Sequence, residues 1–291
     1  MSLATALSTL ANYRSHNSRA SQDVFDKGSV VLKSGATKKL GDASWDFLEQ
    51  LALASIDVGR LDVADECIHL LVTKFPESPR VDVLSGIRME ASETPDVALA
   101  YYDQLIEVDP SSGALWKRRI AVLRRMGKIE KTVEELNQFL DTFYNDVEGW
   151  LELADIHATC YQYTASLQAL SHLLLLNPQN PFYFLKFAET AYTSGDLPLA
   201  LKMFLVVVDM SEREDELVKG PPRGIAIRAW FGIKQCSRRL LANPNHQSAS
   251  HTATPKHLNL IEELSTERIL AAYSGKGVLG LPAVRQWLGR V

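Results

Sequence analysis

The sequence of 291 residues predicts an all-α fold, a solenoid in which hairpins of two antiparallel helices stack on one another. Pro76 and Pro110 are separated by 34 residues, and Pro110 and Pro178 by twice that number. The same period aligns a column of small residues with columns of large apolar residues. Because 34 residues is the length of a tetratricopeptide repeat, the expected fold is a right-handed tetratricopeptide-repeat solenoid (an α-α superhelix) of about five repeats with capping helices.

The repeat region covers residues 45–214, and its register follows from two columns of the alignment. The expected repeats are 45–78, 79–112, 113–146, 147–180 and 181–214. Position 20 is small in every repeat, with Ala64, Ala98, Thr132, Ser166 and Ala200. Position 24 is large, with Ile68, Tyr102, Leu136, Leu170 and Phe204. Small residues let two helices cross closely, and residues four apart share a helix face, so these columns predict the core of each hairpin.

The turn inside each hairpin has a weaker signature. Gly59, Gly127 and Gly195 occupy the position where the first helix should end, as expected for a left-handed C-terminal cap. Glu93 and Tyr161 replace this glycine in the second and fourth repeats. The pattern therefore predicts the same turn in all five repeats, with two departures from the preferred residue.

The flanking segments are expected to cap the solenoid. Residues 1–44 are interpreted as an N-terminal tail, frayed over 1–17, followed by a capping helix over 20–33. Residues 215–291 are interpreted as a C-terminal helix pair, with helices near 224–241 and 256–273 and a tail whose segment 281–288 adds a last turn. The polar segment 243–255 is expected to be a flexible loop between the two helices.

Composition and motifs exclude several classes of function. A net charge of -4 and a pI near 6.0 argue against nucleic acid as the main partner. No secretory signal and no apolar run of membrane-spanning length is evident, which predicts a chain that crosses no membrane by itself. The three cysteines have no metal-ligand spacing, and phosphate-binding and hydrolase motifs are absent. We therefore expect no enzyme activity, no cofactor and no metal; an enzyme with an unrecognised site in the helical array is the alternative.

The first helix of each hairpin is expected to line the inner surface of the solenoid, where partners bind. In this register the candidate partner-binding residues are Arg80, Lys117, Arg118, Arg124, Arg125, Leu151, Asp155, Glu189 and Tyr192. They form a basic centre beside acidic and aromatic neighbours, which suits an extended peptide with charges and apolar anchors. The alternative is that these charges are only solvated side chains.

Several segments are not explained by the repeat pattern alone. They include residues 86–91 (Gly-Ile-Arg-Met-Glu-Ala), 117–121 (Lys-Arg-Arg-Ile-Ala) and 135–137 (Glu-Leu-Asn). Together with 148–154 and 177–180, these segments make residues 40–240 resemble the family of subunit 2 of the endoplasmic reticulum membrane protein complex. The segments 243–255 and beyond 274 match that family poorly.

The resemblance implies a non-catalytic, cytosolic scaffold that is peripheral to the endoplasmic reticulum membrane. It would organise the cytosolic part of an insertase for tail-anchored and multipass membrane proteins. The implied partners are the cytosolic parts of transmembrane subunits 3 and 5 and the soluble subunit 8 or 9. The alternative is another tetratricopeptide adaptor that has no role in membrane insertion.

Overall fold

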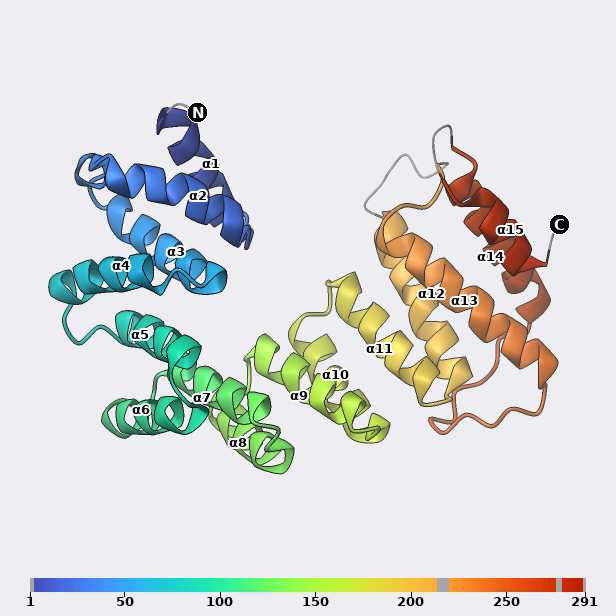
Figure 1. The fold of residues 1–291 in the computed structure, drawn as a ribbon. Coiled ribbons are helices and arrows are strands. Elements are labelled where there is room, and N and C mark those ends of the chain that lie inside the picture. The colour runs from blue at the N-terminus through green and yellow to red at the C-terminus, as the bar shows by residue number, and fades with distance from the viewer. Residues whose placement is uncertain (1–2, 214–219, 276–278, 290–291) are drawn as a thin grey trace. The chain divides into compact units, whose positions relative to one another are not determined.

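The structure is a computed structural model that describes residues 3–213, 220–275 and 279–289. Across these residues the regular structure is entirely helical, with fifteen α-helices and one short 3-10 helix and no strand. This confirms the predicted all-α class. The helices belong to two compact units, Met1–Asp141 and Thr142–Val291 (Figure 1).

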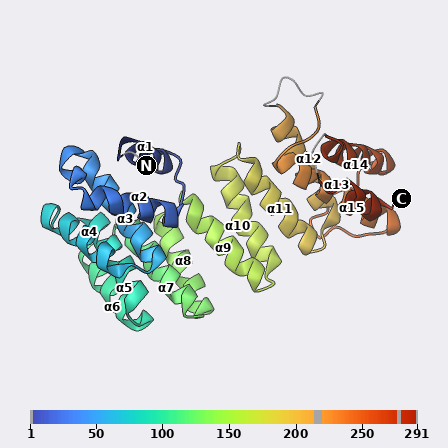
Figure 2. The same ribbon diagram turned by 45° about the horizontal axis from the view of Figure 1, so that its top comes forward.

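The first unit is a series of helix hairpins, each packed on the next. Its helices are α1 (Leu3–Ser15), α2 (Ser21–Lys33), η1 (Ala36–Lys39), α3 (Ala43–Val58), α4 (Leu61–Lys74), α5 (Pro79–Ser92), α6 (Pro95–Val108), α7 (Gly113–Arg125) and α8 (Ile129–Thr142). Helix α2 packs on α3, α4 on α5 and α6 on α7. Figures 1 and 2 both show this order, with α1 beside α2 at the N-terminal end.

The second unit continues the same construction. Its helices are α9 (Val147–Thr159), α10 (Tyr163–Leu176), α11 (Pro181–Thr193), α12 (Leu197–Arg213), α13 (Ile225–Ala242), α14 (Leu258–Tyr273) and α15 (Leu281–Leu288). Helix α11 packs on α12, α12 on α13 and α13 on α14. Helices α13, α14 and α15 lie where the sequence predicted helices, within two residues at each end.

Burial confirms the predicted register. The five small residues of position 20, Ala64, Ala98, Thr132, Ser166 and Ala200, are all buried, with at most 1% of their surface exposed. Two of them carry hydroxyl groups, and each hydroxyl donates to a backbone carbonyl: Ser166 Oγ to Ala154 and Thr132 Oγ1 to Lys128. The column can therefore be polar without leaving an unpaired buried group.

The turn column adopts the left-handed backbone that its glycines favour. Gly59, Gly127 and Gly195 have φ values of 79°, 73° and 90°. Tyr161 adopts the same conformation at φ 61°, although it has a side chain. Glu93 departs from the pattern, because its backbone is extended at φ -101° and α6 begins two residues later. The fourth repeat therefore keeps the turn at a steric cost, whereas the second repeat replaces it.

Replacing Tyr161 with glycine should stabilise the second unit by about 1 kcal/mol, because a left-handed residue with a Cβ is strained. The Tyr161 side chain is 80% exposed, so its removal costs little packing. Urea denaturation of Tyr161→Gly measures the gain, with Tyr161→Ala as the control that retains the strain. Equal stability of the two variants would show that the backbone conformation carries no cost.

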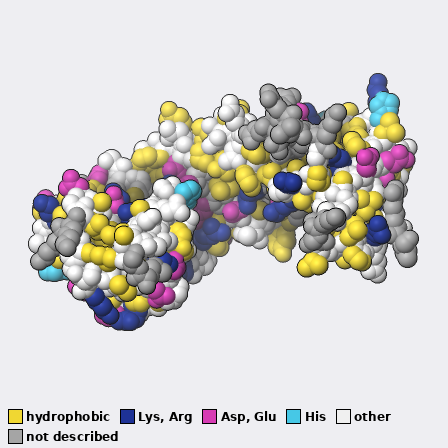
Figure 3. All heavy atoms as spheres, turned by 90° about the horizontal axis from the view of Figure 1, so that it is seen from above, with side chains coloured by type: hydrophobic (Ala, Val, Ile, Leu, Met, Phe, Trp, Pro, Cys, Tyr) yellow, Lys and Arg dark blue, Asp and Glu magenta, His cyan; other side chains and the backbone are white. Residues whose placement is uncertain are grey.

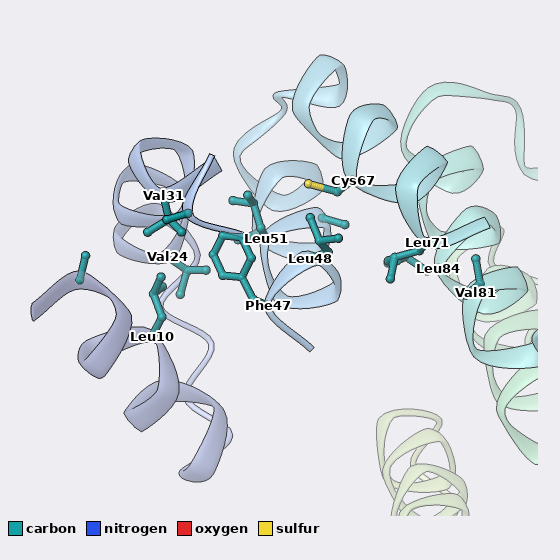
Figure 4. Packing of buried hydrophobic residues seen from close by; sticks show 14 residues of the cluster. Leu10, Val24, Val31, Phe47, Leu48, Leu51, Cys67, Leu71, Val81 and Leu84 are labelled. Carbon is teal, nitrogen blue, oxygen red and sulfur yellow. The ribbon is translucent and has the colours of Figure 1, made fainter. Parts of the chain in front are cut away.

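The N-terminus differs from the expectation of a frayed tail. Residues Leu3–Ser15 form α1, and Ala6 and Leu10 are buried in one apolar cluster with Val24 and Phe47. Figure 4 shows Leu10 pointing towards Val24 and Phe47 from the neighbouring helices. Residues 1 and 2 lie outside the described chain. Leu7 and Tyr13 also pack, partly buried, against this cluster. The prediction was wrong because the small and polar residues between these positions weaken the apolar periodicity of the segment.

The segment 243–255 has no helix, which agrees with the expected loop. It differs from the expected flexible loop in being anchored to the rest of the unit by hydrogen bonds. Asp196, in the turn between α11 and α12, is buried and accepts from Ser248 Oγ and from the backbone N–H of Ser250, both at 2.8 Å. His246 Nε2 lies 2.8 Å from the carbonyl oxygen of the residue before Asp196. One carboxylate therefore ties this loop to the turn of the fifth repeat.

Replacing Asp196 with alanine should release this loop and destabilise the second unit by about 2 kcal/mol, because the part-buried hydrogen bonds from Ser248 and Ser250 lose their acceptor. Burial raises the pKa of Asp196, but the hydrogen bonds from Ser250 and Ser248 outweigh it, so the pKa lies below its usual value. The anchor is thus complete above the unfolded-state pKa and is lost as the pH falls through the folded-state pKa. Hydrogen exchange over residues 246–252 measures the release; unchanged protection in Asp196→Ala would contradict the anchoring role.

Candidate functional site

The first unit contains a cavity of about 790 Å³ along one face of α3. Asp46, Glu49, Leu53 and Asp57 line it from α3, and these are inner positions of the first repeat in the predicted register. The end of α1, the turn into α2, α5 and α7 supply the other walls. The inner surface of this unit therefore forms a cavity of a size typical of ligand pockets.

Ion pairs cross the cavity from one helix to the next. Arg80 on α5 lies 2.5 Å from Glu49 and 3.5 Å from Asp46, both on α3. Arg19 donates two hydrogen bonds to Asp57, at 2.6 and 2.9 Å, and this pairing lowers the pKa of the Asp57 carboxyl group. Arg80 was predicted to bind a partner; the structure places it in the cavity with its charge offset by two acids.

Glu90 is the centre of a network at the inner edge of α5 and α7. Its carboxylate accepts from Tyr102 Oη at 2.7 Å and from Arg118 Nη2 and Nε at 2.7 and 3.0 Å. Arg125 Nη1 lies 3.8 Å from the other carboxylate oxygen. The Glu90 side chain is only 8% exposed. Burial, followed by the hydrogen bond to Glu90, raises the pKa of Tyr102 well above its usual value.

This network changes the interpretation of the basic stripe on α7. Lys117, Arg118, Arg124 and Arg125 do lie on this one helix, as the sequence predicted. Arg118, however, binds the buried Glu90 and holds α7 to α5, so its first role is structural. Arg125 is exposed, although it also donates to the Glu90 carbonyl oxygen at 3.3 Å, and Lys117 and Arg124 are half-buried with contacts within the fold. Partner contacts by these three residues stay a prediction.

The four candidates of the second unit lie on α9 and α11. Asp155 forms an ion pair with Lys186 of the next first helix. Glu189 pairs with Arg228 of α13 through two hydrogen bonds of 2.5 and 2.9 Å.

The two other candidates of this unit are uncharged. Tyr192 lies under the guanidinium of Arg239, with 4.7 Å between the charge and the ring centroid. Leu151 is half-buried on α9. The first helices of this unit are therefore joined by charge pairs, as in the first unit, and also by a cation–π contact.

Helix α15 adds a wall to this inner surface that sequence reasoning missed. A second cavity, of about 600 Å³, is lined by Glu189, Tyr192, Arg228 and Phe231 together with Trp287 of α15. Trp287 packs edge-on against Phe231, with ring centroids 5.2 Å apart. Trp287, the one aromatic residue in 281–288, was the available signal, but its partner on α13 could not be read from spacing. Five predicted site residues thus belong to the first unit and four to the second.

The chemistry of these surfaces suits contact with other molecules through charge pairs and apolar side chains. Figure 3 shows basic and acidic side chains interspersed with hydrophobic ones on one face of the molecule. Over residues 3–213, 220–275 and 279–289, no group of three or more metal-ligating side chains comes together. Burial raises the pKa of the Cys67 and Cys236 thiols to about 12, so both act as apolar packing groups.

Within residues 3–213, 220–275 and 279–289, no helix is both long enough and apolar enough to cross a bilayer.

Comparison with known proteins first defines the class. The solved structure of the C-terminal part of a TPR repeat-containing protein from Cytophaga hutchinsonii is similar to this fold, with a TM-score of 0.57 at 12% sequence identity. The match covers 90% of this chain and 97% of that one. This likeness and the confirmed register make the chain a tetratricopeptide-repeat protein. Residues 61–199 match the family described as the EMC2 TPR-like repeat domain.

Two relatives define the family within that class. The chain is 35% identical over 238 residues to "ER membrane protein complex subunit 2-B" of Xenopus laevis, covering 81% of this chain and 76% of the relative. It is 30% identical over 223 residues to "TPR repeat protein oca3" of Schizosaccharomyces pombe, covering 75% and 74%. The chain belongs to the family of ER membrane protein complex subunit 2.

Proposed function

We propose that this chain is a non-catalytic scaffold subunit of an endoplasmic reticulum membrane protein complex. The observation that carries the proposal is the 35% identity to a protein of that name over most of both chains. Two further observations support it. The fold is built from repeats that bind proteins through their inner surfaces, and each unit has a cavity on that surface.

The scaffold would lie on the cytosolic face of the membrane as a peripheral subunit. There it would organise the cytosolic part of an insertase for tail-anchored and multipass proteins. Its partners would be the cytosolic parts of transmembrane subunits 3 and 5 and the soluble subunit 8 or 9. The described part of the chain has no helix suited to spanning a bilayer, so partners rather than its own helices would hold it at the membrane.

Protease protection of intact microsomes tests this placement. The chain should sediment with the membranes, and protease added from outside should digest it without detergent while a lumenal marker stays intact. Protection of the chain until detergent is added would exclude the cytosolic face. Recovery only in the supernatant would favour the alternative of an adaptor unrelated to membrane insertion.

Charge reversal on α7 tests whether the inner surface of the first unit holds a partner. Lys117→Glu combined with Arg124→Glu should reduce co-purification of the membrane subunits by about tenfold. The reason is that the two new carboxylates would face partner groups that complement cations, and like charges across an interface weaken binding. Arg118 is left unchanged, since reversing it would place a second carboxylate against buried Glu90.

The matched control for this variant reverses Lys33 and Lys202, which are exposed and lie on α2 and α12. Lys117 and Arg124 have contacts within the fold, so thermal denaturation of both variants is measured in parallel. If the Lys117→Glu/Arg124→Glu variant is folded and still co-purifies the membrane subunits to the same extent, α7 is not part of the partner-binding surface.

A further inference from the structure

A separate feature of the first unit lies where α1 meets α3, at one side of the 790 Å³ cavity. Arg14 from the last turn of α1 and Gln50 from α3 both line the cavity there. We propose that this corner is a binding site for a carboxylate group of a peptide, and that Arg14 is the residue that binds it. This deepens the proposed function, because it gives the chemistry of a segment that the scaffold would hold.

Arg14 differs from the other arginines of the cavity in the pairing of its charge. Of the described arginines that line the cavity, Arg19 is paired with Asp57, Arg80 with Glu49, and Arg118 with Glu90. Arg14 is the exception, because its guanidinium donates to the amide oxygen of Gln50, a neutral group. Among the residues that the structure describes, no acid therefore pairs with its positive charge, and a carboxylate in the cavity would complete the pairing that its neighbours already have.

Gln50 orients the guanidinium of Arg14. Gln50 Nε2 donates to the carbonyl oxygen of Leu10 at 3.2 Å, and Gln50 Oε1 accepts from Arg14 Nη1 at 2.8 Å. Both the Nε2 and the Oε1 atoms of the Gln50 amide are therefore hydrogen-bonded, which fixes the orientation of the amide and of the guanidinium that it binds. One N–H of Arg14 is used by this bond, and a guanidinium has five. The remaining donors can take a carboxylate oxygen pair side by side.

The lining and the size of the cavity suit a peptide. Leu53, Ala54 and Ile87 line it beside the charged groups, so it offers apolar contact close to the cationic corner. A volume of about 790 Å³ exceeds the needs of a small free anion and fits several residues of a peptide. The preferred ligand is therefore a peptide in which an acidic side chain, or the terminal carboxylate, follows an apolar residue.

The test uses the full chain and three peptides of equal length with one common leucine-rich sequence. The first has an internal glutamate and an amidated end, the second has glutamine there and an amidated end, and the third has that glutamine and a free terminal carboxylate. Affinity is measured by fluorescence polarisation, and the Nε–Hε resonance of Arg14 is followed by NMR. We expect the first or the third peptide to bind about tenfold more tightly than the second.

The ranking of the first and third peptides separates an internal acid from a chain terminus. Arg14→Gln should abolish the preference for either carboxylate. Gln50→Glu should also abolish this preference, although Arg14 is still present, because the new carboxylate would form an ion pair with the Arg14 guanidinium. Gln138→Glu makes the same change on the exposed surface of α8 and should leave the preference unaltered.

Equal binding of the three peptides, no binding of any of them, or a preference that survives in either Arg14→Gln or Gln50→Glu would overturn the proposal. Circular dichroism and the melting temperature show that each variant is folded. Because the measurement uses the isolated chain and synthetic peptides, its failure would leave the microsome result, and with it the proposed function, standing.

Discussion

Replacing Glu90 with alanine should destabilise the first unit by about 3 kcal/mol, the largest effect expected of a single substitution in that unit. The Glu90 carboxylate is nearly buried and accepts from Tyr102 and Arg118, with Arg125 close by. Its removal leaves the guanidinium of Arg118 partly buried with no counter-charge, and the Tyr102 hydroxyl without its acceptor. Urea denaturation followed by circular dichroism measures the loss.

Two comparisons separate this charge effect from simple truncation. Glu66→Ala removes an exposed glutamate from α4 and should change the free energy of unfolding by less than about 0.5 kcal/mol. The double variant Glu90→Leu with Arg118→Met should recover much of the loss, because an apolar pair can replace a buried ion pair. A Glu90→Ala variant as stable as Glu66→Ala would contradict the structural role assigned to this network.

Replacing Gly86 with alanine should destabilise the same unit by about 2 kcal/mol, because the core has no room for one more methyl group. A Cβ at this position would lie 2.5 Å from Tyr102 Cε1 and Oη, far inside van der Waals contact. Tyr102 is fully buried, so its ring cannot swing into solvent. Thermal denaturation of Gly86→Ala measures the cost.

The neighbouring repeats supply the control for this prediction. Position 8 of the first and fourth repeats is Ala52 and Ala154, where position 24 is an aliphatic residue instead of Tyr102. The double variant Gly86→Ala with Tyr102→Leu should therefore be more stable than the sum of the single effects predicts, by about 1 kcal/mol or more. Strict additivity of the two substitutions would show that the contact between them is not the cause.

The repeat register could be predicted because it depends on local pattern. Small residues at position 20 and large ones at position 24 recur in each repeat, and every small one is buried. Helix α1 escaped prediction because small and polar residues separate Ala6, Leu7 and Leu10, which pack on the core. The Asp196 anchor escaped because its partner Ser248 lies 52 residues further along the chain.

The candidate site could be predicted only in part, and for the same reason. The helices that carry the basic stripe followed from the register. The register did not show which cations have partners within the fold. Arg118 and Glu90 are 28 residues apart in the sequence, and Arg14 and Gln50 are 36 apart. Spacing along one helix gives the face of a residue, but a partner on another helix depends on how the hairpins stack.

The central claim is that this chain holds membrane-protein subunits together, and purification from membranes in mild detergent tests it most directly. An affinity-tagged chain is isolated and the bound proteins are identified and quantified by mass spectrometry. The account predicts recovery of transmembrane subunits 3 and 5 and of the soluble subunit 8 or 9 in amounts comparable to the chain. Recovery of soluble proteins alone would contradict it.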